Sequence, residues 1–420
     1  MTRPLGTLAV GLVLLACLGP LVPLLLRAGQ GAPATADWAA LRFTLVQAAL
    51  SALFSVGLAV PLARALARRR FRGRGLLVTL LGAPFLLPTL VAVMGLLALF
   101  GRQGFFNDLL ALMGLPRLSI YGLHGVVLAH VFLNLPLATR LLLQGWQDIP
   151  AERFRLAATL NAPVGPLLEW PMLRAVAPGA FAAVFALCLT SFSVALILGG
   201  GPAATTLELG IYQAIRFEAD LAAAARLALL QYAICGAAAW VAWRLTAGPF
   251  LGAGLGRPVE RWDAPGLESR LLDGAVIGAA ALFLLLPLAL AAWRGALGLP
   301  DVPPEAGPAL VRSLLVALAA AALAVLLALA LAHRGGALAQ VAGALPLAAS
   351  PFVLGAGCCW RFGPWRSPPP SPFPRRRWPT RCSRCPSLCE CSRRRWRRSR
   401  RGTAGSPRRW ASAARGACGS

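Results

Sequence analysis

The residues best suited to bind a small polar solute are a few amide and hydroxyl side chains inside long apolar runs. Asn134, Thr190, Ser191 and Ser193 lie in such runs. Polar groups inside a membrane tend to face a helix-bundle interior or a solute path. They also form hydrogen bonds between helices. We therefore expect these four residues either to line a path across a membrane or to join neighbouring helices.

Motifs for bond chemistry are missing from the sequence. It contains no GxxxxGK[ST] phosphate loop, no HExxH and no GxSxG, which are the signatures of nucleotide binding, zinc proteolysis and serine hydrolysis. His130 lies four residues before Asn134, but no second metal ligand is within reach by spacing. We predict no catalytic residue, no metal site and no cofactor, and we do not expect an enzyme.

The composition places the chain in a membrane. Of its 420 residues, 58% are hydrophobic, and its mean hydropathy is +0.68. A helix needs about 20 apolar residues to cross a bilayer, and continuous Leu- and Ala-rich runs of that length favour helices over barrel strands. The sequence predicts an all-α, polytopic transmembrane helical bundle with nine spans: 5–26, 40–63, 75–100, 120–143, 176–198, 221–245, 271–293, 309–332 and 336–357.

Arginine sets the predicted orientation, because the chain has no lysine. The loop 64–74 carries six arginines and is cytoplasmic by the positive-inside rule. Alternation then places the N-terminus, 144–175 and 246–270 in the cytoplasm. We expect a multi-pass membrane protein with a cytoplasmic N-terminus, surrounded by lipid.

A weak internal repeat divides the predicted spans into two halves. Residues 40–50 read ALRFTLVQAAL and residues 309–319 read ALVRSLLVALA; transporters are often built from such repeats. We predict a first half at 1–245 with six spans, a Pro- and Gly-rich cytoplasmic linker at 246–270, and an incomplete second half at 271–357 with three spans.

The tail 358–420 differs abruptly from the rest of the chain. It holds seventeen Arg, one Glu and seven of the ten Cys, without apolar periodicity, and we expect it to be disordered. One interpretation is a polybasic arm for nucleic acid or anionic lipid; another is a zinc site at Cys382, Cys385, Cys389 and Cys391. We favour a third, a shifted reading frame that truncates the protein, because the tail would place its arginines on the outer face. We accordingly expect no nucleic-acid partner.

An amphipathic segment, Ala151–Pro178, separates two of the apolar runs. Its sequence is AERFRLAATLNAPVGPLLEWPMLRAVAP. A helical hairpin of this kind outside the bilayer needs a partner, since its apolar face can bury in a cleft of another protein. A soluble motor on the cytoplasmic side is the partner that we expect.

Part of this segment, RLAATLNA, resembles the EAA loop of ABC importer permeases. Ala157, Leu160 and Ala162 match that pattern, whereas Arg155 stands where Glu is usual, Leu156 where Ala is usual and Asn161 where Gly is usual. Asn tolerates left-handed backbone geometry better than most residues. The resemblance implies a coupling helix that docks in a cleft of the ATPase subunit, with the later prolines of the family at Pro171 and Pro178.

A second stretch, GGGPAATTLELGIYQA at 199–214, resembles the permeases of thiamine and thiamine pyrophosphate importers, and more distantly those of iron(III) importers. The resemblance implies a type I ABC importer permease that works with an ATPase dimer and a periplasmic substrate-binding protein. We expect the stretch to face the binding protein, or Glu208 and Tyr212 only to anchor the loop; its candidate residues are Gly199, Gly200, Gly201, Pro202, Thr205, Thr206, Glu208 and Tyr212.

Two alternatives remain open at this point. An iron(III)-type permease shares much of the resemblance. An ion-coupled secondary transporter would need intramembrane acids, for which Asp273 is the nearest candidate. The preferred hypothesis is a thiamine permease of which one half is incomplete, so that we expect the chain not to support uptake.

Overall fold

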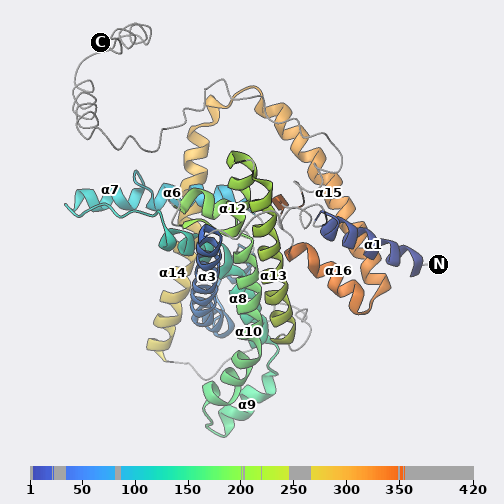
Figure 1. Ribbon diagram of the computed structural model, residues 1–420. Helices are drawn as coiled ribbons and strands as arrows, with labels where there is room; N and C mark the ends of the chain where they lie inside the picture. Colours follow the sequence, from blue (N-terminus) through green and yellow to red (C-terminus); the bar gives the residue numbers. More distant parts are fainter. Residues whose placement is uncertain are drawn as a thin grey trace, which may run out of the picture. The chain divides into compact units, whose positions relative to one another are not determined.

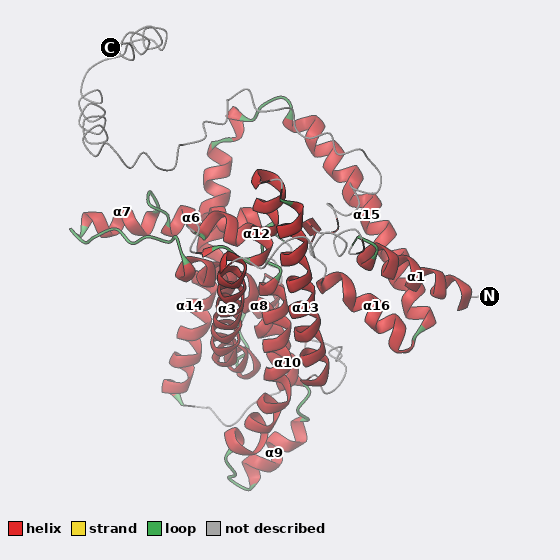
Figure 2. Ribbon diagram, in the orientation of Figure 1, coloured by secondary structure: helices red, strands yellow, loops and turns green. Residues whose placement is uncertain are grey.

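The computed structural model describes residues 3–20, 22, 35–80, 87–199, 201, 204–218, 220–245, 266–348, 351–352 and 354. All regular secondary structure in these ranges is helical (Figure 2). The predicted all-α fold is therefore confirmed. Most of the predicted linker, 246–265, and the whole predicted tail, 358–420, lie outside the described residues, so the predicted division of the chain stays a prediction.

Long helices form the body of the protein, and shorter helices and single turns connect them (Figure 1). The long helices are α3 (Thr35–Arg68), α8 (Leu123–Gln147), α10 (Trp170–Leu189), α13 (Leu221–Leu245), α14 (Leu267–Leu297) and α15 (Ala306–Arg334). The shorter helices are α1 (Arg3–Leu18), α4 (Arg74–Leu80), α6 (Thr89–Phe100), α7 (Phe105–Leu112), α9 (Ala151–Thr159), α11 (Ser193–Leu198), α12 (Leu207–Gln213) and α16 (Gly336–Ala348), with turns η1 (Gly165–Glu169), η3 (Ala214–Glu218) and η4 (Leu299–Asp301).

Seven described helical segments are long and apolar enough to cross a bilayer. They have 20 to 32 residues each, which matches the thickness of the hydrocarbon core. This confirms a polytopic membrane protein. The segments are Asp37–Arg68, Thr89–Leu112, Leu123–Gln147, Gly165–Leu189, Ala222–Val241, Leu267–Leu297 and Ala306–Arg334.

The structure corrects two of the nine predicted spans. Two others, the first and the ninth, lie partly outside the described residues. The predicted span 75–100 is not one helix: α4 ends at Leu80, and α6 begins after Pro88. Proline lacks an N–H and disfavours helix at the residue before it. The predicted first and ninth spans, 5–26 and 336–357, run into residues that are not described.

The predicted span 176–198 is also wrong in its bounds. Its helix begins at η1, so the second helix of the amphipathic segment continues without a break into the span. Pro171 lies in the first turn, where its missing N–H is tolerated. The helix then ends at Leu189, and α11 starts only at Ser193.

The centre of the bundle is formed by α3, α8 and α10, which pack against one another (Figure 1). Fully buried alanines on α3 face this contact. They form two pairs spaced four residues apart, Ala48 with Ala52 and Ala59 with Ala63. In a membrane, small residues four apart let helix backbones approach, because packing rather than the hydrophobic effect drives association. The small-residue pattern of α3 therefore explains its central place.

A second close contact joins α14 to α6 and α8. A Cβ atom at Gly95 would lie 2.7 Å from the backbone oxygen of Pro287, so only glycine allows α6 to approach α14 this closely. The rings of Phe132 and Phe283 meet edge to face, with their centroids 5.7 Å apart. These contacts hold the middle of α14 against α6 and α8.

Candidate functional site

The hairpin at 151–178 begins with α9, which ends in a complete Schellman motif. The N–H of Ala162 donates to the carbonyl of Ala157 at 2.8 Å, and the N–H of Asn161 donates to that of Ala158 at 3.3 Å. Asn161 has φ +50°, the only positive φ at a non-glycine residue in the described ranges. Glycine usually occupies this position of the motif. Asn161 therefore adopts the left-handed backbone conformation that glycine would have in the family pattern.

An apolar and basic surface covers the outer side of this hairpin. Leu156 is 60% exposed and Leu160 68%, and Arg155 is exposed beside them. Trp170 is exposed and lies under the guanidinium of Arg174, 4.9 Å from its ring centroid. Of the predicted coupling residues, Ala157 is buried and Ala162 and Pro178 are half-buried, while Pro171 is exposed. We name Arg155, Leu156, Leu160 and Trp170 the hairpin surface.

A buried carboxylate attaches the hairpin to the bundle. One oxygen of Glu169, Oε2, lies 2.7 Å from the guanidinium of Arg64, and the other, Oε1, lies 3.8 Å from that of Arg68. Trp146 Nε1 donates to Oε1 at 3.1 Å. Glu169 thus joins the start of α10 to α3 and α8. The sequence analysis assigned this residue no role. An acid directly before an apolar span, in a chain with an arginine-rich loop at 64–74, could have indicated an ion pair between the two.

A second ion pair lies at the same end of α3. Arg69 Nε donates to Asp273 Oδ2 at 2.7 Å, and the same guanidinium contacts the hydroxyl of Ser269. Asp273 is the acid that the sequence analysis named as the nearest candidate for ion coupling. Its carboxylate instead neutralises an arginine and ties α14 to α3.

The four polar residues predicted to line a path lie together around one cavity of about 480 Å³. Its wall comes from α8, the α10–α11 break and the start of α6. Apart from the polar groups, the wall is apolar, which is typical of small-molecule sites. The lining residues are Leu87, Thr89, His130, Leu133, Asn134, Leu187, Thr190, Ser191, Phe192, Ser193, Pro351 and Phe352.

The cavity lies where α10 ends, before α11 begins. The end of a helix leaves carbonyl groups without helical partners, and these need other donors when they are buried. Gln47 Nε2 donates to the carbonyl of Cys188 at 2.9 Å, and Gln231 Nε2 donates to that of Leu189 at 3.1 Å. These two glutamines thus satisfy the carbonyl groups at the end of α10. Irregular backbone of this kind is tolerated where it lines a cavity.

Behind the cavity, α3 presents a polar seam that the sequence analysis missed. Thr44, Gln47, Ser51 and Ser55 are fully buried, and their spacing of three and four residues would have indicated one helix face. Ser51 Oγ and His130 Nδ1 share a hydrogen bond of 3.3 Å. Asn134 Nδ2 donates to the carbonyl of His130 at 2.9 Å. The seam therefore positions the polar wall of the cavity.

The stretch 199–212 places two of its candidate residues inside the bundle. Thr206 caps α12 by accepting from the N–H of Leu209 at 3.3 Å. Glu208 is 0% exposed and accepts from Gln231 at 3.4 Å. Both side chains are therefore held inside, which fits the alternative that Glu208 anchors the loop. That this stretch faces a binding protein stays a prediction.

The remaining residues of this stretch have mixed placements. Tyr212 packs on Phe192 and Phe352, with ring centroids 5.1 and 5.5 Å away. Thr205 is half-buried, Gly199 is buried and Gly201 is exposed with φ +132°. Gly200 and Pro202 lie outside the described residues. Tyr212 thus contacts the aromatic side of the cavity.

A bundle of membrane-crossing helices, a polar cavity between them and an amphipathic hairpin at one end together define a membrane permease. The similarity of the sequence to known proteins agrees with this class. The chain is 43% identical over 329 residues to the thiamine transport system permease protein ThiP of Salmonella typhimurium, which covers 75% of this chain and 61% of that protein. It is 46% identical over 292 residues to ThiP of Escherichia coli, covering 67% of this chain and 54% of that protein.

A third relative is matched over most of its own length. The chain is 30% identical over 167 residues to the molybdenum transport system permease protein ModB of Azotobacter vinelandii, covering 39% of this chain and 74% of that protein. No family model matches the chain. The chain belongs to the permease family of ABC importers. It spans a little over half the length of the ThiP proteins of Salmonella typhimurium and Escherichia coli.

Proposed function

We propose that the chain is a membrane-spanning permease subunit that moves thiamine or thiamine pyrophosphate into the cytoplasm, with ATP hydrolysed by a separate subunit. The observation that carries the proposal is the similarity to thiamine permeases, 40 to 46% identity over about 70% of the chain. That similarity coincides with a polar cavity in the membrane. A permease makes and breaks no bonds, so the chain itself is not an enzyme; its work is to alternate between two packings.

The hairpin surface is the proposed docking site of the ATPase dimer. Leu156 and Leu160 are exposed and lie outside the seven membrane-crossing segments. Such exposed leucines on a short helix fit an apolar cleft of a partner protein. Glu169 and its two arginines hold the base of the hairpin rigidly, so that a force on α9 reaches α3 and α10.

The cavity is the proposed substrate path. Asn134, Thr190, Ser191 and Ser193 supply hydrogen-bonding groups, and Phe192 and Phe352 supply aromatic faces. Thiamine is a flat cation, and aromatic faces attract cations. The lining contains no charged residue, which suits a solute that must leave again.

The proposed orientation follows from the arginine-rich end of α3. Arg64, Arg68, Arg69 and Arg70 lie there, on the side of the bundle that carries α9 (Figure 1). The positive-inside rule places this end in the cytoplasm of a bacterial inner membrane, with the N-terminus on the same side. The opposite end, with Thr205 and Gly201 near α12, then faces a periplasmic substrate-binding protein.

Neither alternative transporter class has a specific observation in its favour. The candidate acid for ion coupling, Asp273, is paired with Arg69 at 2.7 Å. An iron(III) carrier would be expected to offer oxygen or nitrogen ligands for the ion. Among the described residues, no group of three or more His, Cys, Asp or Glu could hold a metal.

Retention of the ATPase subunit tests the proposal. The full chain and the ATPase subunit of a thiamine transport system are co-expressed and purified through a tag on the chain. We expect the wild type to retain the ATPase, and the pair Leu156→Asp with Leu160→Asp to lose it by about tenfold or more, as for removal of a central apolar contact. Leu118→Asp, an exposed leucine in the loop before α8, is the matched control. Equal retention by all three chains would contradict the proposal.

A further inference from the structure

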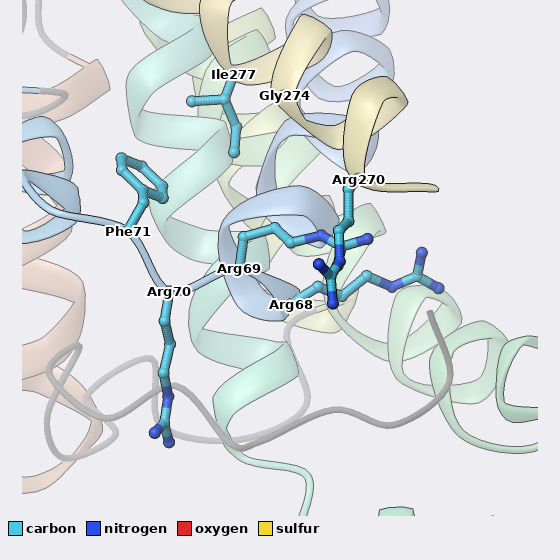
Figure 3. A pocket seen from close by; sticks show the side chains of 7 residues that line it. All are labelled: Arg68, Arg69, Arg70, Phe71, Arg270, Gly274 and Ile277. Carbon is cyan, nitrogen blue, oxygen red and sulfur yellow. The ribbon is translucent and has the colours of Figure 1, made fainter. Parts of the chain in front are cut away.

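A second cavity, of about 560 Å³, opens between the end of α3 and the first turns of α14 (Figure 3). Four of the seven residues that line it are arginines. The remaining lining is apolar or small. The lining residues are Arg68, Arg69, Arg70, Phe71, Arg270, Gly274 and Ile277.

Two arginines from different parts of the chain converge in this cavity. Figure 3 shows the side chains of Arg69, which directly follows α3, and Arg270, from α14, approaching one another, with Arg68 beside them; Arg70 points away. Arg69 is held in place by Asp273 and Ser269. Arg270 is exposed. Like charges held close together favour an anion between them.

The surroundings carry an excess of positive charge. Six arginines lie at 64–74 and a seventh is Arg270, against the carboxylates of Glu169, Asp273 and Glu268. Burial lowers the pKa of Arg74, and the charge of Arg70 lowers that pKa further. The corner of the bundle is therefore strongly electropositive.

A separate apolar groove lies further along α14. It has a volume of about 390 Å³ and begins at Gly278, one helical turn after Gly274. No atom lies within 4 Å of a Cβ built at either glycine, so both positions leave open space on the helix surface. The groove is lined by Gly278, Ala281, Leu282, Leu285, Leu286 and Ala289.

We propose that this cavity and groove bind one anionic phospholipid, with its phosphate at Arg69 and Arg270 and an acyl chain along α14. A basic pocket between membrane helices on the cytoplasmic side is suited to an anionic headgroup. A free phosphate ion would use the arginines but not the apolar groove, so the presence of the groove one helical turn along α14 favours a lipid. The site shares no lining residue with the Asn134 cavity and does not depend on which solute is carried.

Site-specific photolabelling tests the proposal. The full chain is reconstituted in phosphatidylcholine nanodiscs that contain phosphatidylglycerol with a photoreactive acyl chain, and labelled peptides are identified by mass spectrometry. We expect labelling of 274–289 that is several-fold stronger with phosphatidylglycerol than with an identically modified phosphatidylcholine. Arg270→Gln should reduce this labelling about fivefold, the effect of one interfacial arginine.

Three controls make the outcome decisive. Arg312→Gln removes the same charge from the exposed surface of α15 and should leave labelling of 274–289 unchanged. Labelling of the arginine-rich residues 358–420 should not respond to Arg270→Gln. Gly278→Leu places a side chain in the groove, at a position where nothing lies within 4 Å of the added Cβ atom, and should reduce labelling while the arginines remain.

Each contrary result overturns the proposal. Equal labelling by the two lipids would show a site without preference for the anionic headgroup. An unchanged signal in Arg270→Gln would show that the arginines are not the contact. Displacement by excess inorganic phosphate as effective as displacement by unlabelled phosphatidylglycerol would assign the site to a free anion instead.

Discussion

Glu169 and Arg64 form an ion pair with an oxygen-to-nitrogen distance of 2.7 Å, and the carboxylate of this pair is almost fully buried. Arg64 lies in the last turns of α3, and Glu169 lies immediately before α10. The pair therefore connects the hairpin that we assign to ATPase docking with the helix that carries the polar seam. Trp146 of α8 donates to the same carboxylate at 3.1 Å, so three central helices meet at one residue.

Neutralising this carboxylate should loosen the hairpin. We expect Glu169→Gln to lower the free energy of unfolding by about 2 kcal/mol, because the arginines lose their counter-charge while an oxygen remains for Trp146. Glu169→Leu should cost more. Denaturation in mixed detergent measures the change. Glu152→Gln, on the exposed face of α9, should have an effect within about 0.5 kcal/mol; equal effects of the two amide variants would show that the ion pair contributes nothing.

The left-handed residue of the hairpin gives a sharper test. At φ +50°, Asn161→Gly should be neutral or stabilising, whereas Asn161→Ala should cost about 1 kcal/mol, because a Cβ atom is disfavoured in this region. Hydrogen exchange at the amides of Asn161 and Ala162, which close the Schellman motif, reports the difference. Equal protection of these amides in the Asn161→Ala and Asn161→Gly variants would show that the left-handed conformation at position 161 does not determine where α9 ends.

The helix break in the membrane depends on its glutamine donors. Gln47→Leu should lower stability by about 1 kcal/mol, since the carbonyl of Cys188 loses its donor in a medium without water. The control is Gln103→Leu, the same substitution at an exposed position between α6 and α7. It should leave the stability unchanged. A Gln47→Leu protein as stable as the wild type would mean that the carbonyl finds another partner.

Close approach of α6 and α14 predicts a steric effect. Gly95→Val should destabilise the fold by about 2 kcal/mol, because the new side chain would meet the backbone of Pro287, which cannot move aside. Gly57→Ala, on α3 with open space around it, should be tolerated. Thermal unfolding in detergent distinguishes the two, and similar midpoints for both variants would place the helices further apart than the structure does.

The sequence alone predicted much of the fold, because bilayer-length apolar runs have few alternatives to helix. It failed where local chemistry interrupts a run. Pro88 separates α4 from α6, and Gln47 and Gln231 stabilise the end of α10 inside the bundle. Hydropathy cannot reveal that a distant glutamine satisfies a broken helix.

The candidate site was predicted unevenly for the same reason. Asn134, Thr190, Ser191 and Ser193 were found because polar residues are rare in apolar runs, and one cavity contains them all. For Glu208 the sequence left two roles open, contact with a binding protein or anchoring of the loop, because a single sequence does not show that Gln231 contacts its carboxylate inside the bundle. Pairs such as Arg69 with Asp273, 204 residues apart, leave no mark on a single sequence.

Equilibrium binding of radiolabelled thiamine tests the central claim most directly. The full chain in nanodiscs should bind thiamine saturably. Asn134→Leu, which removes the cavity amide, should weaken binding about tenfold, as expected when a polar contact to the ligand is lost, and Gln103→Leu should bind as the wild type does. No saturable binding by the wild type, or equal binding by Asn134→Leu, would contradict the assignment of this cavity to the thiamine path.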